Sequence, residues 1–372
     1  MSRFRLQSIV AGALGAVLVS SQLALAAPVG YSTTPLDTFN VKGTVYASVV
    51  VGDNVYVGGN FAKVRHKGVD YPYQHLAAFD LATGALVTGF QPNPSSEVRA
   101  LDVHGSSLFV GGKFISIGGQ WRTRVAKIDV TTGLADAAFN ASASARVDAI
   151  ETDGSRVFLG GSFTTVSGAV RAKLAAVDAV TGAIDPWNPG AGSGSVAALK
   201  LSPDATVVYV GGGFNTIAGS NRTKLAAIST TSGAVVGNDF SGASENVRSL
   251  DVSATGSVLY AGDDGNDLEA YDVASGARNW RNTIPQGDVQ ATHVATDGNV
   301  YIGFHDGADG MTNARVAAID SATGVAVSWN PTFSSTYGVF AISSTSERLV
   351  IGGEFWNVSG VAQDGIAVFP LA

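Results

Sequence analysis

Short apolar runs recur along the whole chain, and most of them alternate with polar or small residues at a period of two. Seven of these runs end in a glycine pair or its remnant, at Val55–Gly59, Leu108–Gly112, Val157–Gly161, Val208–Gly212, Leu259–Gly262, Tyr301–Gly303 and Leu349–Gly353. Successive runs start about 50 residues apart, which indicates a repeat architecture. Each repeat is therefore expected to be one structural unit.

Each repeat contains four strand-like segments. The first alternates, as in Val98–Val103, and the second is the run into the glycine pair. The third has the form of Leu76–Asp80, and the fourth ends in an aromatic residue such as Phe139 or Trp187. Their β-branched and aromatic residues are typical of strands. An Asp-x-x-Thr/Ser-Gly sequence joins the third segment to the fourth and predicts a hairpin turn.

This pattern predicts an all-β protein, folded as a seven-bladed β-propeller with four-stranded antiparallel blades. The last repeat stops at Ala372 without a fourth segment. The missing segment stands at the other end of the chain, where Leu36–Asn40 matches Asp136–Asn140. We therefore predict that the N-terminal strand 36–40 completes blade 7 and closes the ring, because closure removes an open sheet edge.

Residues 1–26 have the features of a secretory signal peptide. Arg3 and Arg5 precede the apolar stretch Ile9–Leu25, and Ala24-Leu-Ala26 fits the cleavage rule. Residues 27–372 then form a single propeller domain. Nothing later in the sequence is long and apolar enough to span a bilayer, so we expect a secreted or cell-surface protein. An uncleaved N-terminal anchor is the alternative.

The amino-acid composition excludes several kinds of binding and catalytic site. The chain has no cysteine, which excludes disulfides, zinc–thiolate sites and thiol nucleophiles. Its formal net charge of −7 disfavours nucleic acid as a partner, since that binding depends on neutralising phosphates. The sequence contains no nucleophile-elbow or zinc-helix motif. We expect a monomer that needs no cofactor, with Ca²⁺ as the one candidate.

Blades 7, 1 and 2 carry aromatic residues that depart from the repeat, in loops that emerge on one side of a propeller. These residues are Tyr71, Tyr73, Trp121, Tyr337 and Trp356. Exposed aromatic rings suit stacking on sugars or docking on a protein, so we predict a binding module for a glycan or a cell-surface protein. The alternative is that these rings pack against the loops of a purely structural surface protein.

Blades 5 and 6 carry acidic residues instead of the repeating pattern. Aligned by position, Asp264 and Asp306 replace a phenylalanine that recurs after the glycine pair. Together with Asp263 and Asp267, these oxygen-rich side chains could hold calcium. With His305, Asp264 and Asp306 could instead provide acid–base catalysis in a polysaccharide hydrolase or lyase. The alternative is a polar loop tip in which Asp and Gly form turns.

Basic residues recur just before the third segment, at Arg122 and Arg124, Arg171 and Lys173, Arg222 and Lys224, and Arg315. Their periodicity favours a structural role, such as pairing with a neighbouring blade. A ring of positive charge that binds an anion is the alternative.

The repeat resembles a known family. The repeat unit is clearest across Val157–Pro189 and Val208–Ser229. It consists of Tyr-Val-Gly-Gly-x-Phe, followed by Arg-x-Lys-Leu-Ala-Ala-Val-Asp, Thr-Gly and Trp-Asn-Pro. It resembles the delta-60-type repeat of secreted bacterial propellers over essentially all of the mature chain. The resemblance implies a propeller and export, and little about activity. The Asp-x-x-Thr-Gly…Trp element is also similar to quinoprotein dehydrogenase propellers, but this chain lacks their adjacent cysteines.

Overall fold

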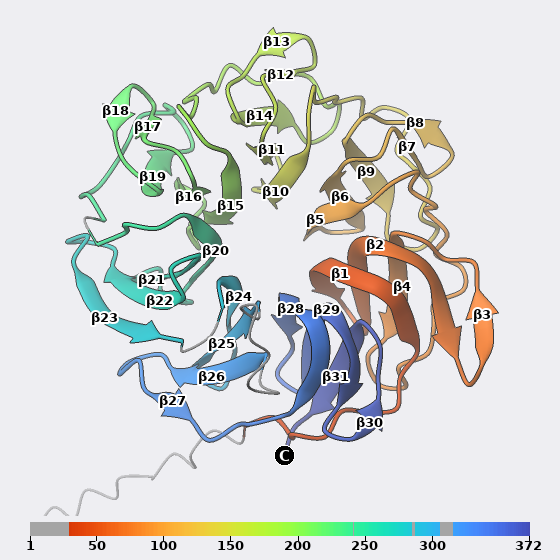
Figure 1. Ribbon diagram of the computed structural model, residues 1–372. Helices are drawn as coiled ribbons and strands as arrows, with labels where there is room; N and C mark the ends of the chain where they lie inside the picture. The colour runs from red at the N-terminus through yellow and green to blue at the C-terminus, as the bar shows by residue number, and fades with distance from the viewer. Residues whose placement is uncertain (1–29, 241, 285–286, 306–314) are drawn as a thin grey trace, which may run out of the picture.

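The computed structural model describes residues 30–240, 242–284, 287–305 and 315–372. The regular elements of this part of the chain are strands. Seven antiparallel sheets of three or four strands surround a central axis, and three two-stranded sheets lie apart from them (Figure 1). The predicted seven-bladed β-propeller is therefore confirmed. Residues 1–26, the predicted signal peptide, lie outside the described part of the chain.

In each blade the first three strands lie side by side in order, from the central axis to the outside. The inner strands are β1 (Asn40–Val51), β5 (Val98–His104), β10 (Val147–Thr152), β15 (Val196–Leu201), β20 (Val247–Val252), β24 (Val289–Val294) and β28 (Phe333–Ser344). The second strands are β2 (Asn54–His66), β6 (Ser107–Gly112), β11 (Arg156–Gly161), β16 (Val207–Gly212), β21 (Val258–Asp263), β25 (Asn299–Phe304) and β29 (Arg348–Val358). The third strands are β4 (Leu76–Asp80), β9 (Val125–Asp129), β14 (Leu174–Asp178), β19 (Leu225–Ser229), β22 (Asp267–Asp272), β26 (Val316–Asp320) and β31 (Ile366–Pro370).

The outer position is regular strand only in blades 5 and 6 of the described chain, as β23 (Arg278–Thr283) and β27 (Ala326–Val327). In blades 1 to 4 it is reduced to isolated bridges, such as Phe79 to Leu86. Short strands between the second and third positions lie at the outer rim (Figure 1). They are β3 (Val69–Tyr71), β7 (Ser116–Ile117), β8 (Gln120–Trp121), β12 (Thr165–Val166), β13 (Ala169–Val170), β17 (Thr216–Ile217), β18 (Ser220–Asn221) and β30 (Val361–Ala362).

The two ends of the ring differ. We call the end that carries these rim strands the hairpin side. The opposite end, the turn side, carries the Asp-x-x-Thr/Ser-Gly turns. In the first of these turns Asp80 accepts hydrogen bonds from the backbone N–H groups of Ala82 and Thr83, and Gly84 takes a φ of +67°. The predicted turn chemistry is therefore confirmed.

The glycine pairs let neighbouring strands approach closely. A Cβ on Gly111 would lie 2.7 Å from Val147 Cγ1, which belongs to the inner strand of the next blade. A Cβ on Gly112 would lie 2.3 Å from the backbone oxygen of Glu97, beside a register shift between β5 and β6. The first glycine thus leaves room for the inner strand of the next blade. The second permits a bulge within its own blade.

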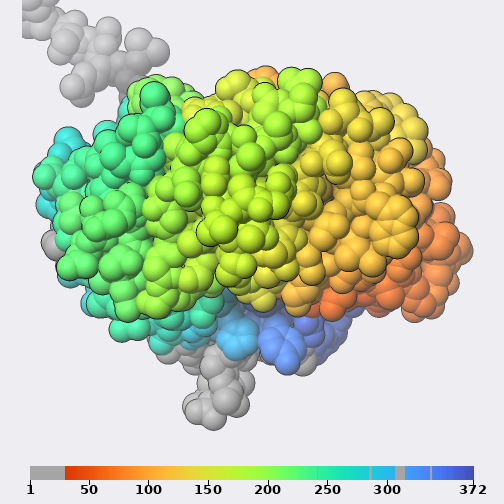
Figure 2. Space-filling model, turned by 90° about the horizontal axis from the view of Figure 1, so that it is seen from above, coloured from red at the N-terminus to blue at the C-terminus, as the bar shows by residue number. Residues whose placement is uncertain are grey.

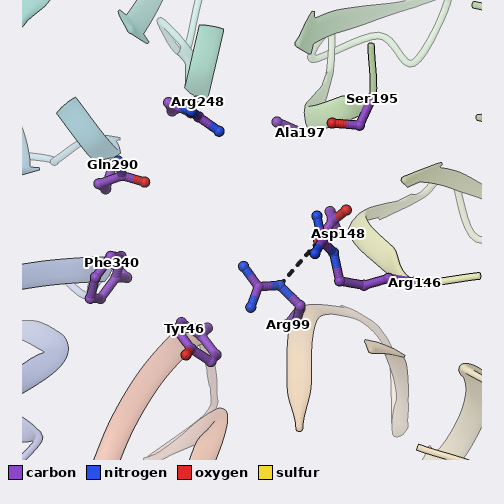
Figure 3. A pocket seen from close by; sticks show the side chains of 9 residues that line it. All are labelled: Tyr46, Arg99, Arg146, Asp148, Ser195, Ala197, Arg248, Gln290 and Phe340. Atoms are coloured by element: carbon purple, nitrogen blue, oxygen red, sulfur yellow. Dashed lines mark hydrogen bonds and ion pairs between the residues drawn. The ribbon is translucent and has the colours of Figure 1, made fainter. Parts of the chain in front are cut away.

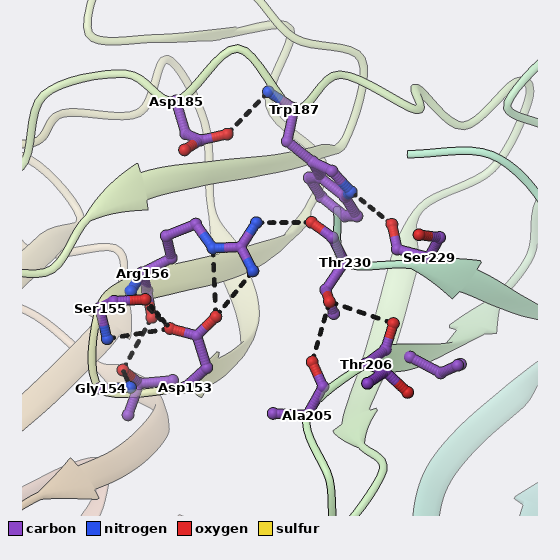
Figure 4. Close-up of polar contacts among 12 residues, drawn as sticks. Asp153, Gly154, Ser155, Arg156, Asp185, Trp187, Ala205, Thr206, Ser229 and Thr230 are labelled. Atoms are coloured by element: carbon purple, nitrogen blue, oxygen red, sulfur yellow. Dashed lines mark hydrogen bonds and ion pairs between the residues drawn. The ribbon is translucent and has the colours of Figure 1, made fainter. Parts of the chain in front are cut away.

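Aromatic residues of the fourth segments connect one blade to the next. Trp187 Nε1 donates to the backbone oxygen of Ser229, in the following blade, at 2.8 Å (Figure 4). Beside it Arg156 donates to both the Asp153 carboxylate and the backbone oxygen of Thr230. Because these donors come from blade 3 and the acceptor turn belongs to blade 4, the network fixes the angle between two blades.

The N-terminal segment lies beside the last strand. The N–H groups of Ser32 and Leu36 each donate to β31, to the oxygens of Pro370 and Val368, at 2.8 Å. Trp329 Nε1, from blade 6, donates to the oxygen of Ser32 at 3.1 Å, as Trp187 does to its own neighbouring blade. Chain start and chain end therefore share one blade.

The pairing residues of this segment lie earlier than predicted. The predicted strand was 36–40, but Asn40 already pairs with Arg65 in the β1–β2 ladder. Phe39 donates its N–H to the oxygen of Gly84 in blade 1. The β1–β2 hairpin of blade 1 is longer than most of the others. The last residues of the predicted strand therefore pair within this hairpin.

Candidate functional site

Three of the predicted aromatic residues are exposed on the hairpin side. Trp121 on β8 is 76% exposed, Trp356 on β29 is 50% exposed, and Tyr337 on β28 is 54% exposed. Tyr73 is buried instead, and its hydroxyl donates to the backbone oxygen of Thr88 at 2.7 Å. Tyr73 therefore supports the loop of blade 1 and does not offer a surface.

Tyr71, the fifth predicted aromatic residue, is half-buried. Its ring packs against that of Phe39, with the centroids 5.4 Å apart. Phe39 in turn stacks on His66 at 4.1 Å. Tyr71 thus anchors the rim of blade 1 to the N-terminal segment.

His305 contacts an aromatic residue across a blade boundary. Its ring lies 5.8 Å from that of Tyr337, and its backbone bridges to Gly338 at the start of blade 7. Asp306, the predicted catalytic and metal partner of His305, lies outside the described residues. The predicted enzyme site therefore stays a prediction.

The acidic residues of blade 5 lie in a network that already supplies hydrogen-bond donors. Asp263 accepts the N–H groups of Gly265 and Asp267, and burial raises its pKa to about 6. The Asp267 carboxylate lies 2.6 Å from both Thr283 Oγ1 and Arg281 Nη2. No group of three or more metal-ligating side chains occurs in the described ranges. The Ca²⁺ prediction is not tested by this, since Asp306 is not among them.

The structure shifts the alignment of blade 5 by one residue. Val247 pairs with Asp263, as Val98 pairs with Gly112 in blade 2. Asp263 therefore takes the place of the second glycine, and Asp264 precedes the phenylalanine position. The prediction that Asp264 replaces that phenylalanine is wrong, because the Ala-Gly remnant was read one position too early.

The second residue of each repeating basic pair connects blades, whereas the first, such as Arg122, bonds within its own blade. Arg124 Nη1 donates to the oxygen of Ala143 in the next blade at 2.8 Å, and Lys224 Nζ donates to Asn246 Oδ1 at 2.8 Å. Arg124, Lys173 and Lys224 all adopt positive φ, between 66° and 70°. A non-glycine residue in this conformation is strained. These residues have the structural role that their periodicity predicts.

A different set of residues surrounds the axis on the hairpin side. One residue from each inner strand contributes, and together with Arg146 and Ser195 they line a cavity of about 130 Å³ (Figure 3). The seven are Tyr46, Arg99, Asp148, Ala197, Arg248, Gln290 and Phe340. We call this cavity the channel mouth.

Aromatic and charged side chains hold one another in the channel mouth. The Arg99 guanidinium lies 4.4 Å above the ring of Tyr46, which meets Phe340 edge to face at 5.7 Å. Asp148 Oδ1 lies 3.0 Å from Arg99 Nε and 2.5 Å from Arg146 Nε. One carboxylate thus positions two arginines from adjacent blades.

Arg248 is paired with a carboxylate that does not itself line the channel mouth. Its Nη2 donates to Asp264 Oδ2 at 2.9 Å, and Asp264 also accepts from the backbone and side chain of Asn246. Asp264, predicted as a catalytic or metal residue, therefore supports an arginine of the channel mouth.

None of the residues of the channel mouth was predicted from the sequence. Seven of them follow the repeated valine of the first segment, as in Val98-Arg99 and Val247-Arg248, while Arg146 and Ser195 precede it, and the identity at the shared position changes from blade to blade. They could have been found by comparing the residue at this one position in all seven repeats, because a closed ring places the seven positions around the axis.

Below the channel mouth, a second cavity of about 190 Å³ continues along the axis. We call it the lower chamber. Small and branched apolar residues line much of it, including Ala100, Ala149, Leu199 and Leu250. Ser48, Ser249 and Thr292 also line it, together with Arg99 and Asp148 of the channel mouth, so its surface is mixed and not simply apolar.

Further along the inner strands, buried charges lie together. Lys200 Nζ contacts Asp251 Oδ1 at 3.0 Å, and Asp102, Glu151 and Asp251 each accept a backbone N–H from the next blade. Burial raises the pKa of Asp102 to about 6 and that of Glu151 to about 8. Burial opposes the charge of Lys200, but the carboxylates of Glu151 and Asp251 raise its pKa above the ordinary value.

Comparison with known proteins agrees with this architecture. A family model described as outer membrane protein assembly factor BamB matches residues 74–330, which is more than half of the chain. The chain belongs to this family. It is a propeller repeat protein of this type, whereas the predicted delta-60 repeat type stays a prediction. No curated protein matches the chain.

Solved structures share the fold. The WD40 β-propeller domain of Doa1 is 13% identical and aligns with a TM-score of 0.62, over 91% of this chain and 97% of that one. A computationally designed protein, Ika8, is 15% identical with a TM-score of 0.57, over 92% of this chain and 100% of its own. At these identities the likeness concerns the fold alone. Within the described residues, no helix has the length and hydropathy needed to cross a membrane.

Proposed function

We propose that this chain is an exported, non-catalytic binding protein that docks a partner protein on the hairpin side of its ring. The observation that carries the proposal is the exposure of two large indole side chains, Trp121 and Trp356, on that side. Tryptophan is among the side chains that contribute most to protein interfaces, so exposed copies are candidate anchors. The family description, which names an assembly factor, also favours a protein-binding role.

The placement of the two tryptophans favours a protein over a glycan. They lie on blades 2 and 7, and neither lines the channel mouth or the lower chamber. Sites for small ligands are concave and bring a few polar groups together around an apolar surface. Anchors on separate blades suit the broad surface of a folded partner, and a glycan becomes one outcome of the test.

The location follows from the N-terminal sequence. Residues 1–26 read as a signal peptide, so the partner is expected outside the cytoplasm, in the exported or surface fraction. The mature protein then begins at Ala27 and acts as a monomer.

Site-specific photo-crosslinking in the producing cells tests this proposal. A benzophenone amino acid at Gln120 or Ala362 would sit next to Trp121 or Trp356 on exposed rim strands and leave both indoles in place. We expect a discrete protein adduct in the exported fraction. Trp121→Ala or Trp356→Ala should reduce its yield strongly, because removing an anchor costs about 2 kcal/mol of binding free energy.

Val180 provides the control. It is 61% exposed and lies in a turn on the turn side of blade 3. A crosslinker at Val180 should give no adduct with the same partner, and Val180→Ala should leave the yield from Gln120 unchanged. Equal adducts from both sides, or a yield insensitive to both tryptophan substitutions, would contradict the proposal. Adducts to carbohydrate alone would replace the protein partner with a glycan.

A further inference from the structure

The channel mouth and the lower chamber form one continuous space on the axis. Their volumes are about 130 Å³ and about 190 Å³, and residues from all seven inner strands surround the opening (Figure 3). The two cavities share Arg99, Asp148, Gln290 and Phe340. Together they are close to the lower end of the size range of ligand pockets, which begins at roughly 300 Å³. The space therefore suits one compact ligand, not a folded domain.

The ionic groups of the channel mouth balance one another. Arg99, Arg146 and Arg248 have side chains that are 28%, 37% and 40% exposed, so solvent reaches all three. Each of them has a carboxylate oxygen within 3.7 Å. The carboxylates are those of Asp148, which two arginines share, Asp264 and Glu97. The opening therefore carries little excess charge of either sign and does not favour an ionic ligand.

Hydrogen-bonding groups of both kinds remain available at this opening. Gln290 Nε2 donates to Asp288 Oδ2 at 3.2 Å, which leaves Gln290 Oε1 pointing into the opening (Figure 3). The hydroxyl groups of Tyr46 and Ser195 neither donate nor accept a side-chain hydrogen bond within the described part of the chain. Each arginine also keeps N–H groups, because a guanidinium has five donors and its carboxylate uses only some of them. The site thus offers donors, an acceptor and hydroxyl groups that can act as either.

An aromatic face lies beside these polar groups. The Arg99 guanidinium covers the ring of Tyr46 at 4.4 Å, and Tyr46 meets Phe340 edge to face at 5.7 Å. Phe340 is half-buried, lines both cavities and contacts no second ring among the described residues. A face of the Phe340 ring is therefore left for a ligand. A flat apolar face next to hydrogen-bonding groups suits the C–H face of a sugar ring.

We infer that the channel mouth binds a neutral sugar unit, free or at the end of a glycan, with its apolar face on Phe340. A hydroxyl group both donates and accepts, so a hydroxyl-rich ligand satisfies all of the available groups. A carboxylate only accepts and an ammonium group only donates. The polar groups come from strands all around the axis, as hydroxyl groups do around a sugar ring. This site goes beyond the proposed protein docking and uses residues other than the rim tryptophans.

Saturation-transfer difference NMR on the intact protein tests the inference. The probes are the methyl glycosides of glucose, galactose, mannose and N-acetylglucosamine, each paired with an oligosaccharide that ends in the same sugar. We expect saturable signals from at least one pair. The oligosaccharide should bind more tightly if the natural ligand is a glycan end, and less tightly if it is a free sugar. Raising the salt concentration should change the affinity by less than about twofold, because a neutral ligand has no charge to screen.

Gln290→Ala and Phe340→Leu are the variants of choice. The first removes an acceptor whose side chain bonds only Asp288 among the described residues, and the second removes the aromatic face but keeps apolar bulk. We expect each to weaken the binding of the best sugar by about fivefold, with little change in melting temperature for Gln290→Ala. The matched control is Gln120→Ala, an exposed glutamine on the rim strand β8. It should change the affinity by less than about twofold.

Several outcomes would overturn the inference. They are the absence of signals from every sugar of the panel, an affinity that neither variant changes, and glucuronate binding about tenfold or more tightly than glucose. Loss of sugar binding in Trp121→Ala would place the sugar on the rim and would also overturn it. Sugar binding without a protein adduct from Gln120 would remove the proposed function and leave this inference standing. An adduct without sugar binding would do the reverse.

Discussion

At the scale of single residues, the first glycine of each pair and a valine of the next blade form a contact that recurs around the ring. In blade 2 the pair is Gly111 with Val147, and in blade 7 it is Gly352 with Val45, which joins the end of the chain to its beginning. A Cβ on Gly352 would lie 2.5 Å from Val45 Cγ1. The glycines are therefore spacers between blades as well as strand residues.

Gly111→Ala tests this spacing. The added methyl group would lie 2.7 Å from Val147 Cγ1, so strands or rotamers must shift. Overpacking of a well-packed core commonly costs about 1–3 kcal/mol of unfolding free energy. We expect a lower melting temperature in calorimetry. Gly89→Ala is the control, because its nearest neighbour would be the Thr131 oxygen at 3.8 Å. Equal melting temperatures for the two variants would contradict the spacer role.

The buried charges of the channel make a prediction about pH. The pKa of Glu151 is about 8 in the folded protein, because burial disfavours its charged form, and is near 4.5 when exposed. Between these values the folded state holds a proton that the unfolded state has lost. The contribution of Glu151 to stability therefore falls as pH rises from about 4.5 to about 8.

Glu151→Gln should remove this dependence. Glutamine resembles the protonated acid and can still accept the N–H of Leu201, which bonds Glu151 at 3.1 Å. We expect the variant and the parent to unfold alike near pH 5, and the variant to be more stable at pH 9. Chemical denaturation at both values measures the difference. Glu347→Gln, on an exposed turn, is the control. An identical pH profile for Glu151→Gln and the parent would refute the assignment.

At the scale of elements, periodicity was sufficient to predict the first three strands of each blade, their order and the turns that follow them, but not the short rim strands or the loss of regular strand at the fourth position of blades 1 to 4. Alternation and glycine pairs mark the first three strands, and the turn of Asp80 forms as its sequence predicts. The predictions were wrong where a segment could pair with either of two neighbouring strands or in either of two registers. The backbone of Asn40 pairs in the long hairpin of blade 1, and only its side chain contacts blade 7, where it accepts the N–H of Asp364. In blade 5 a single remaining glycine, Gly262, left the register open by one residue, and only pairing with β20 fixes it.

The residues of the channel mouth escaped prediction for a different reason. Tyr46 and Phe340 are nearly 300 positions apart in the chain and differ from the equivalent residues of other repeats. A repeat is recognised by what its copies share, whereas a site on the axis is built from what they do not share. Only the closed ring brings these positions together.

At the scale of the whole molecule, the ring makes one surface out of seven repeats. The channel mouth takes a residue from every inner strand, so its shape depends on all blades being in place. The contact between Tyr46 and Phe340 exists only because blade 7 meets blade 1. That meeting depends in part on the N-terminal segment, through Leu36 on β31 and the bond from Trp329 to Ser32.

Amide hydrogen exchange of the intact protein tests the closed ring most directly. The N–H of Leu36 donates to Val368, and that of Ser32 donates to Pro370, so both should exchange about a thousandfold or more slowly than in an unstructured peptide. Their protection should match that of β31 itself. Exchange of Leu36 and Ser32 at the free-peptide rate, while β31 stays protected, would show that the chain start does not close the ring.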